Sequence, residues 1–191
     1  MITTARFARP LCSAAATSLI LLGLLAPNAA AAECPGANDI PATQDDTGAA
    51  ASAVMCLVNA ERTKRDLKPL KRDKDLAQAA RGHSADMVRR NFFSHVTPGG
   101  TDLKDRLREA GYGKPSDGWR AGENIGWGTG SRATPASLVD EWLDSPAHKR
   151  NMLQDHFREI GVGVAAGAPK ASTGGLPGAT YTIDLGVIRP G

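Results

Sequence analysis

No apolar run in this chain of 191 residues is long enough to cross a lipid bilayer. The longest run, at about residues 14–25, is shorter than the roughly 20 residues that a membrane-spanning helix needs. An excess of charge of one sign is also lacking, because 23 basic residues face 20 acidic ones and the formal net charge is +3. The first absence argues against a stable membrane anchor, and the second against the basic surface by which proteins bind nucleic acid.

Familiar catalytic motifs are missing too. The sequence contains no Ser nucleophile elbow, no His-Glu-x-x-His pair and no Walker motif. We therefore expect no organic cofactor, and no reaction can be inferred from a motif of this kind.

The N-terminus has the order of a secretory signal peptide. Arg6 and Arg9 precede the apolar run, and Ala30 and Ala32 offer small side chains at the −3 and −1 positions of a cleavage site. We predict that residues 1–32 are removed on export and that the mature protein is extracellular. The loss of two arginines would lower the formal charge from +3 to +1.

Cysteine is rare, with three residues in the whole chain. Cys12 would leave with the signal peptide, so Cys34 and Cys56 remain as an even pair in an oxidising compartment. A disulfide between them would close a loop of roughly 23 residues and contribute about 3 kcal/mol in the chain-entropy model. Two free thiols with a catalytic role are the alternative, although neither cysteine lies in a nucleophile-like motif.

The residues after the signal peptide are enough for one domain that buries most of its apolar surface. Residues 33–50 are rich in Pro, Gly, Asp and Ala and contain no aromatic side chain, which is typical of a linker. We predict a flexible N-terminal arm over residues 33–50 and a single monomeric domain over residues 51–191.

Helical periodicity is strongest after Asp73, a residue suited to the N-cap position. Apolar and small side chains then recur at four, three and four residues along one face. We predict helices at about residues 50–66, 74–91 and 102–110, the third capped by Thr101 and ended by Gly111. Two more helices are predicted to open at Thr134-Pro135 and at Ser145-Pro146, because a capping residue is followed by proline at the first helical position.

Strands are predicted late in the chain. Residues 160–166 and 180–187 alternate in hydrophobicity and are separated by a Gly/Pro/Ser loop at 167–179, and a short strand or bent loop is expected at 121–127. Helices followed by strands, without βαβ alternation, favour the α+β class. In the helix after Thr134, the side chain of Trp142 is predicted to face the core with Leu138 and Val139.

Four histidines are the side chains that titrate near neutrality without special tuning. His83 lies within an apolar stripe, which favours a buried core histidine, and His156 lies in a predicted loop, where a structural or exposed role is expected. His95 stands at a helix–loop junction and His148 in the first turn of a helix. Glu123 is flanked by a Gly-rich segment that leaves its carboxylate little cover. Taken alone, His95 could equally be a solvent-facing loop histidine, and a glutamate such as Glu123 is more often a surface or backbone-capping residue.

Four motifs in order change that interpretation. They are Phe93-Ser94-His95, Gly122-Glu123-Asn124-Ile125, the run from Trp142 to Asn151 (WLDSPAHKRN), and Glu159-Ile160-Gly161-Val162-Gly163. With this spacing, residues 52–188 resemble the bacterial branch of the CAP superfamily, which is named after cysteine-rich secretory proteins, antigen 5 and pathogenesis-related 1 proteins.

The resemblance implies a three-layer α-β-α sandwich with a central cleft. In many members, two histidines and two acidic residues line that cleft and can hold a divalent cation. Matched by motif, they are His95, Glu123 and His148 here, while Ser145 stands where eukaryotic members have the second acid. Glu141 or Asp144 could replace that acid, or the site could have three members.

Two imidazoles and one carboxylate supply three ligands and leave a position open for water, which is the usual composition of an open Zn²⁺ site. Without a metal, the same groups could act as general base and acid. By resemblance we expect a secreted protein whose cleft binds a small molecule, lipid or peptide, with Zn²⁺ or another divalent cation as an optional cofactor. The alternatives are a cation-dependent hydrolase or protease acting outside the cell, and a protein that signals or scaffolds through its surface.

Overall fold

The computed structural model describes residues 34–114, 116–170 and 174–189, so the predicted signal peptide lies outside the described residues. The elements are η1 (Gln44–Asp46), α2 (Thr47–Thr63), β1 (Lys71–Arg72), α3 (Lys74–Arg90), α4 (Leu103–Ala110), β2 (Gly118–Thr129), η2 (Gly130–Ala133), α5 (Pro135–Asp144), α6 (Pro146–Met152), β3 (Glu159–Ala166) and β4 (Gly178–Arg189). None of the helices in this described part is long and apolar enough to span a membrane.

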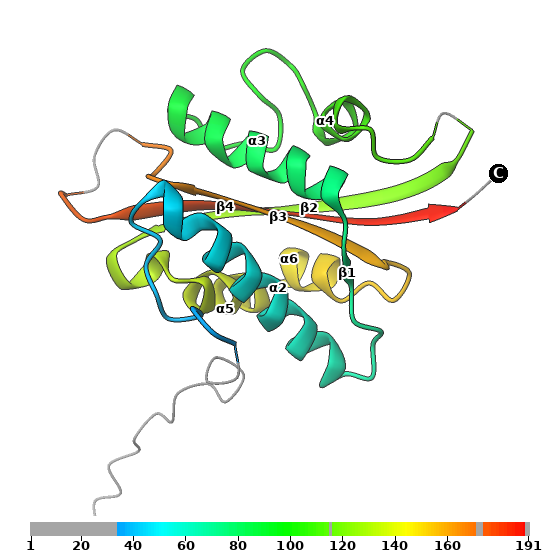
Figure 1. Cartoon of the computed structure of the whole chain (residues 1–191), viewed down its shortest axis with the longest axis horizontal. Helices are drawn as coiled ribbons and strands as arrows, with labels where there is room; N and C mark the ends of the chain where they lie inside the picture. The colour runs from blue at the N-terminus through cyan, green and yellow to red at the C-terminus, as the bar shows by residue number, and fades with distance from the viewer. Residues whose placement is uncertain (1–33, 115, 171–173, 190–191) are drawn as a thin grey trace, which may run out of the picture.

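The four strands form one sheet in the order β1-β3-β4-β2. β1 pairs with β3 in parallel, and β4 pairs antiparallel with both β3 and β2. α3 and α4 cover one face of the sheet, and α2, α5 and α6 cover the other (Figure 1). The predicted α+β class and three-layer sandwich are therefore confirmed, with β2 at an edge of the sheet.

Each face of the sheet has its own apolar core. On the face covered by α2 and α5, Val54 and Leu57 pack with Trp142 and with Ile183 and Leu185 of β4. The opposite core is smaller and contains four buried residues, namely Leu76, Ala79, Leu107 and Tyr112. Side chains alternate between the two faces along each strand, so β4 contributes to both layers.

Two glycines of β3 set the distance between the sheet and α3. A Cβ atom at Gly161 would overlap the backbone of Leu76 and Ala77, and a Cβ atom at Gly163 would overlap the backbone of Ala80 and Arg81. Glycine at these positions lets the helix backbone lie directly on the strand. This close contact fixes α3, and with it His83, against the sheet.

The helix caps agree with the sequence patterns at most positions. The Asp73 side chain accepts hydrogen bonds from the backbone of Asp75 and Leu76, and Gly111 ends α4 with a φ of 87°. Thr134 accepts from the Ser137 backbone in front of Pro135. Thr101, however, is not the cap of α4: the helix begins one residue later than predicted, so Asp102 is the cap and accepts from Asp105.

The strands extend further than their patterns indicate. A short strand or bent loop was predicted at 121–127, and β2 runs over Gly118–Thr129, because it pairs with β4 along its whole length. β1 was not predicted, since two exposed residues carry no periodicity. Pairing with neighbouring strands can stabilise a strand whose own sequence shows only a weak strand pattern.

The predicted flexible arm differs from the structure over residues 34–50. Cys34 and Ala37 are buried in the larger core, and Ala136 donates a backbone hydrogen bond to the Ala37 carbonyl at 2.8 Å. The predicted disulfide between Cys34 and Cys56 is confirmed and ties this segment to α2. Composition alone indicated a linker, but a covalent link and small alanine side chains allow the segment to pack.

Candidate functional site

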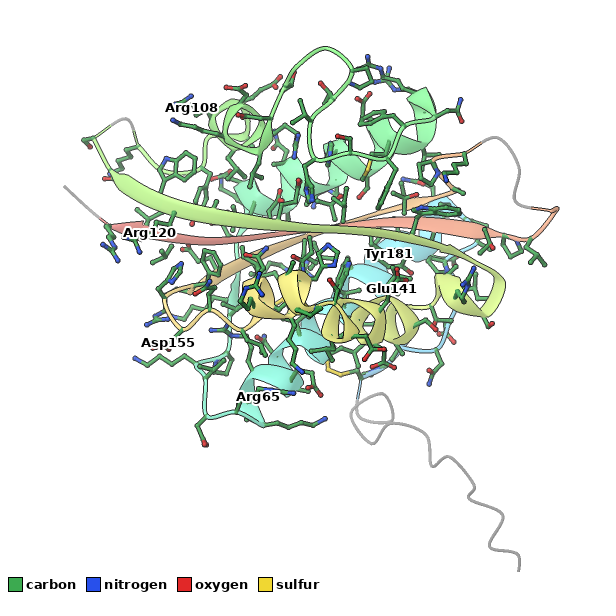
Figure 2. The ribbon with its side chains drawn as sticks, turned by 180° about the vertical axis from the view of Figure 1, so that it is seen from behind. Arg65, Arg108, Arg120, Glu141, Asp155 and Tyr181 are labelled. Carbon is green, nitrogen blue, oxygen red and sulfur yellow. A yellow bond between two sulfur atoms is a disulfide. The ribbon has the colours of Figure 1, made fainter. Side chains whose placement is uncertain are left out.

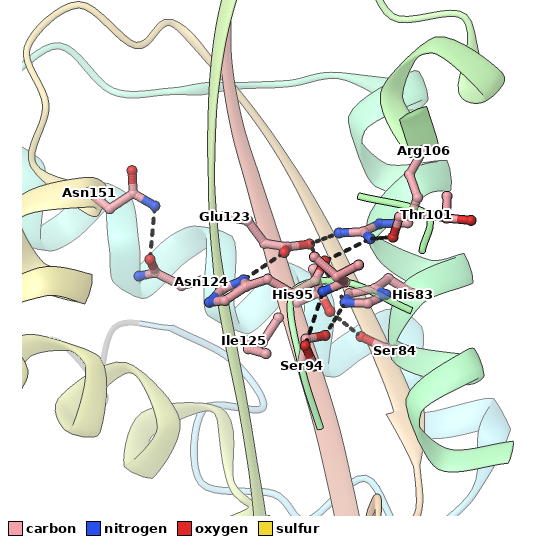
Figure 3. Close-up of polar contacts among 12 residues, drawn as sticks. His83, Ser84, Ser94, His95, Thr101, Arg106, Glu123, Asn124, Ile125 and Asn151 are labelled. Atoms are coloured by element: carbon pink, nitrogen blue, oxygen red, sulfur yellow. Dashed lines mark hydrogen bonds and ion pairs between the residues drawn. The ribbon is translucent and has the colours of Figure 1, made fainter. Parts of the chain in front are cut away.

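The candidate site is centred on Glu123, which lies on the edge strand β2. Its Oε1 accepts a hydrogen bond from His95 Nδ1 at 2.7 Å, and its Oε2 accepts one from Arg106 at 2.6 Å. Figure 3 shows the carboxylate held between these two side chains. The Glu123 side chain is 3% exposed and that of His95 is 53% exposed, so the imidazole covers the acid and faces outward itself.

Glu123 is an anion in this setting. Burial alone would raise the pKa of its carboxyl group, but the hydrogen bond from His95 and the charge of Arg106 hold that pKa below its usual range. Arg106 also donates to the carbonyl oxygens of His95 and Thr101. One guanidinium therefore fixes both the carboxylate and the loop that carries His95.

His83 is buried on α3, as its apolar stripe predicted, and the structure places it beside Glu123. Its Nε2 lies 3.0 Å from the Ser94 carbonyl oxygen and 4.0 Å from Glu123 Oε2. A carbonyl only accepts, so Nε2 carries the hydrogen and Nδ1 carries a lone pair. Burial, the largest cause, lowers the pKa of His83, so the ring is neutral at physiological pH.

The depressed pKa of His83 makes the stability of the fold depend on pH. The unfolded chain binds a proton at His83 below about pH 6.5, where the folded chain resists it, so this residue destabilises the fold as pH falls. In urea unfolding between about pH 8 and pH 5, we expect His83→Gln to reduce the loss of stability on acidification. An equal loss in the wild type and the variant would contradict this expectation.

Asp184 faces Glu123 across the β2–β4 pair. It is fully buried, and neither of its carboxyl oxygens has a hydrogen-bond donor among the described residues. Burial first, and the charge of Glu123 second, raise the pKa of Asp184 well above its usual range. Both effects favour the neutral, protonated form of Asp184 beneath Glu123.

His148 approaches the same region from α6. Together with His95 and Glu123 it lines a cavity of about 290 Å³ along the edge of β2. Asn124, the residue after Glu123, fixes α6 there by donating to the His148 carbonyl at 3.1 Å and accepting from Asn151 at 2.9 Å. Burial, and then the charge of His95, lower the pKa of His148.

Glu141 and Asp144, the two candidates for a second acid, are both exposed on α5. Glu141 is not among the residues that line the cavity with His148, although its charge raises the pKa of His148 and so opposes the effect of burial. Figure 2 shows Glu141 and Arg108 of α4 on opposite sides of the sheet. In this structure Glu141 therefore affects the pKa of His148 through its charge, but its side chain does not line the cavity.

A second cavity, of about 390 Å³, adjoins the first at His95 and Glu123. Its wall includes the apolar side chains of Val96, Leu103 and Trp119. The His95–Glu123 pair thus stands between a polar compartment and a more apolar one. We call the two compartments together the cleft.

A metal ion bound by Glu123 would have to replace hydrogen bonds that its carboxylate already accepts. Both oxygens of Glu123 accept from protein donors, and no group of three His, Cys, Asp or Glu residues in the described segments is arranged to hold a metal. The residues as placed therefore do not fit the Zn²⁺ site expected from the resemblance. Zn²⁺ binding at His95, His148 and Glu123 stays a prediction that would require Glu123 to change partners.

Sequence reasoning missed Arg106 and Asp184, and it included Asn124 in a motif without assigning it a role. Arg106 stands beside Leu107 on the buried face of α4, and Asp184 interrupts the apolar strand 180–187. A charge on a buried face is the signal that could have indicated both residues. The motif indicated Asn124 but not its role, because that role depends on where α6 lies.

Comparisons with known proteins agree with the fold. The model of the cysteine-rich secretory protein family matches residues 55–176. The uncharacterized protein YkwD of Bacillus subtilis is 37% identical over 144 residues, which cover 70% of this chain and 53% of that protein. The chain thus spans about half the length of this curated relative.

Two solved structures have a similar fold. An extracellular protein of Bacillus anthracis that contains an SCP domain is 29% identical, with a TM-score of 0.61 over 75% of this chain and 43% of that one. An outer surface protein of Borrelia burgdorferi is 19% identical, with a TM-score of 0.55 over 71% of this chain and 90% of that one. At that identity the second likeness supports the fold alone.

Proposed function

Because the chain belongs to the cysteine-rich secretory protein (CAP) family, we propose that it is a secreted binding module whose cleft takes an amphiphilic ligand, either a lipid or an apolar peptide. In this proposal, the ligand-binding residues of the cleft include His95, Glu123 and His148. No catalytic step is needed for this role.

One observation carries the proposal: a polar and an apolar compartment meet at the His95–Glu123 pair. His148 and Asn151 line the polar side, and Leu103 and Trp119 line the apolar side. Ligand sites commonly combine an apolar wall with a few placed polar groups. A ligand with a polar head beside His148 and an apolar part along Trp119 would use both compartments.

Export is part of the proposal and has two supports. The disulfide between Cys34 and Cys56 is of a kind that persists in oxidising compartments. The similar protein of Bacillus anthracis is described as extracellular. Both observations agree with the signal peptide that the sequence predicts.

Calorimetric titration of the mature protein with decanoate tests the cleft. We expect saturable binding that weakens about tenfold in His148→Ala, equivalent to about 1.4 kcal/mol, and also weakens in Trp119→Ala, which shortens the apolar wall. His156→Ala is the control, because His156 packs against Phe157 and is not among the residues lining either compartment. If His148→Ala and Trp119→Ala bind decanoate as tightly as His156→Ala and the wild type do, decanoate binds outside the cleft.

A hydrolase is the second candidate, and the short contact between His95 and Glu123 favours it. A carboxylate that accepts from Nδ1 orients the ring and leaves Nε2 as a base, which is the arrangement of a general-base dyad. On this alternative, hydrolysis of an ester or peptide probe should be lost in Glu123→Gln, with or without added Zn²⁺. If Zn²⁺ binds once Glu123 has changed partners, its affinity should fall as pH drops through the histidine range, since protonated imidazoles do not ligate metals. Activity that survives Glu123→Gln would exclude the dyad.

A further inference from the structure

A further cavity, of about 780 Å³, lies where α4 leads into the start of β2 (Figure 1). Lys104 and Arg108 line it from α4, and Lys114 lines it from the turn after that helix. Trp119 lines it from β2. The cavity adjoins the apolar compartment of the cleft, since Lys104 and Trp119 line both, but it shares no lining residue with the compartment of His148. Its volume falls within the range of small-molecule sites.

The cationic side chains of this wall are accessible to a ligand. Lys104, Arg108 and Lys114 are exposed residues, and the Arg108 side chain is 59% exposed. Lys104 and Lys114 form no ion pair with any other residue that the structure describes. Arg108 has one ion pair, a 3.7 Å contact with the equally exposed Asp105, and such exposed pairs contribute little. Most of the positive charge in the wall is therefore available to an anion.

The spacing of two of these cations also favours an anion. Lys104 and Arg108 are four residues apart in α4, so they are neighbours on the same side of the helix. Like charges at this spacing destabilise a helix. An anion bound between the two side chains would relieve that repulsion.

Asp117 contributes the acidic side chain of the wall, and its carboxylate is already engaged. It accepts a hydrogen bond from the Lys114 backbone N–H at 3.0 Å, while the Asp117 N–H donates to the Lys114 carbonyl at 2.9 Å. These two bonds hold Lys114 beside the cavity. Arg120 also borders the cavity, but side chains alternate along β2 and Trp119 is the one that faces α4, so the Arg120 guanidinium points the other way. Three cationic side chains and one carboxylate leave a formal charge of +2.

Trp119 adds a fixed apolar surface to the cationic wall. Its indole is half-buried and meets the Tyr112 ring edge-on, with centroids 6.0 Å apart. Tyr112 is itself fixed, because its hydroxyl donates to Glu159 at 2.7 Å. A Cβ atom at Gly113 would lie 3.0 Å from the indole Cδ1, so glycine lets the turn pass close to the ring. The indole is thereby held in place while part of it stays accessible to an apolar group.

We propose that this cavity is a binding site for a phosphate monoester that carries an apolar group. The phosphate lies among Lys104, Arg108 and Lys114, and the apolar group packs on Trp119. A phosphate monoester carries a charge of about −1.5 to −2 at neutral pH, which complements the wall. Arginine can bind phosphate through two parallel hydrogen bonds, and lysine binds it as a point charge. The site does not depend on the function proposed for the cleft.

Calorimetric titration of the mature protein with phenyl phosphate tests the proposal, and the indole N–H signal of Trp119 reports where the probe binds. We expect saturable binding that shifts this signal and weakens as the salt concentration rises. Replacing both cations of α4, by Lys104→Gln together with Arg108→Gln, should weaken the binding by about tenfold or more. Benzoate, which has the same ring but a single charge, should bind clearly more weakly than phenyl phosphate.

Lys68→Gln together with Arg81→Gln is the matched control, because it removes the same two kinds of charge from exposed residues that do not line the cavity. Equal affinity for phenyl phosphate in the two double variants would overturn the proposal. Benzoate binding as tight as that of phenyl phosphate would overturn it too. His148→Ala should leave phenyl phosphate binding unchanged, which separates this site from the ligand proposed for the cleft.

Vesicles distinguish the two sources of a phosphate monoester, a soluble molecule and a lipid headgroup. The protein is sedimented with vesicles of phosphatidylcholine, with and without phosphatidic acid. Sedimentation that needs phosphatidic acid, and that is lost in the Lys104/Arg108 double variant but not in the control, would assign the phosphate to a lipid headgroup. Binding of phenyl phosphate alone would assign it to a soluble molecule. If the protein binds neither, the proposal is wrong.

Discussion

Replacing Trp142 by alanine is expected to lower the free energy of unfolding by about 3–5 kcal/mol, the range for large aromatic truncations in cores. Trp142 is 1% exposed and packs in the larger core, where its indole Nε1 donates to the Ile125 carbonyl at 3.0 Å. The variant leaves a cavity between α5 and the sheet and also removes the donor to a buried carbonyl. Urea unfolding monitored by circular dichroism measures the loss.

Trp127→Ala is the matched comparison for this change. Trp127 lies on the same strand as Ile125 but is only half-buried, and its ring contacts Lys170 through a cation–π interaction. Its truncation should therefore cost clearly less than that of Trp142. Equal losses in the two variants would show that Trp142 is not the main contact between α5 and the sheet.

The second large effect is expected at Gly163. Alanine at this position places a methyl group inside the backbone of α3, which cannot move aside as a side chain can. We expect a loss of about 3 kcal/mol, the upper end of the range for overpacking, together with a displacement of α3. Since α3 carries His83, a change in its ring signals should accompany the loss.

Gly118→Ala is the control for Gly163→Ala, because both positions are in strands and a Cβ atom at Gly118 would make only ordinary contacts. Its effect should stay within about 0.5 kcal/mol. A Gly163→Ala protein as stable as the Gly118→Ala protein would mean that α3 can lift off the sheet at little cost.

These elements also show where sequence patterns succeed. Asp73, Gly111 and Thr134 were predicted as helix boundaries, because capping and helix ends depend on residues close in the chain. The length of β2 and the existence of β1 depend on pairing with distant strands. Local periodicity carries no information about such pairing, which is why those predictions fell short.

The same distinction applies to the candidate site. His95, Glu123 and His148 were singled out by motif, and the structure places all three around one cavity. Arg106 belongs to another helix and reaches Glu123 only because α4 packs beside α3. The motifs identified the residues at the surface of the cleft, whereas the buried partners that set their charge required the fold.

The central position of β4 has a consequence for the order of synthesis. β4 lies between β3 and β2 and pairs with both, yet it follows every other described element in the chain. Until residues 178–189 have left the ribosome, β2 has no strand to pair with and neither core is complete. Pairing at such sequence separation is slow to form. The sheet therefore closes only after β4 has been made.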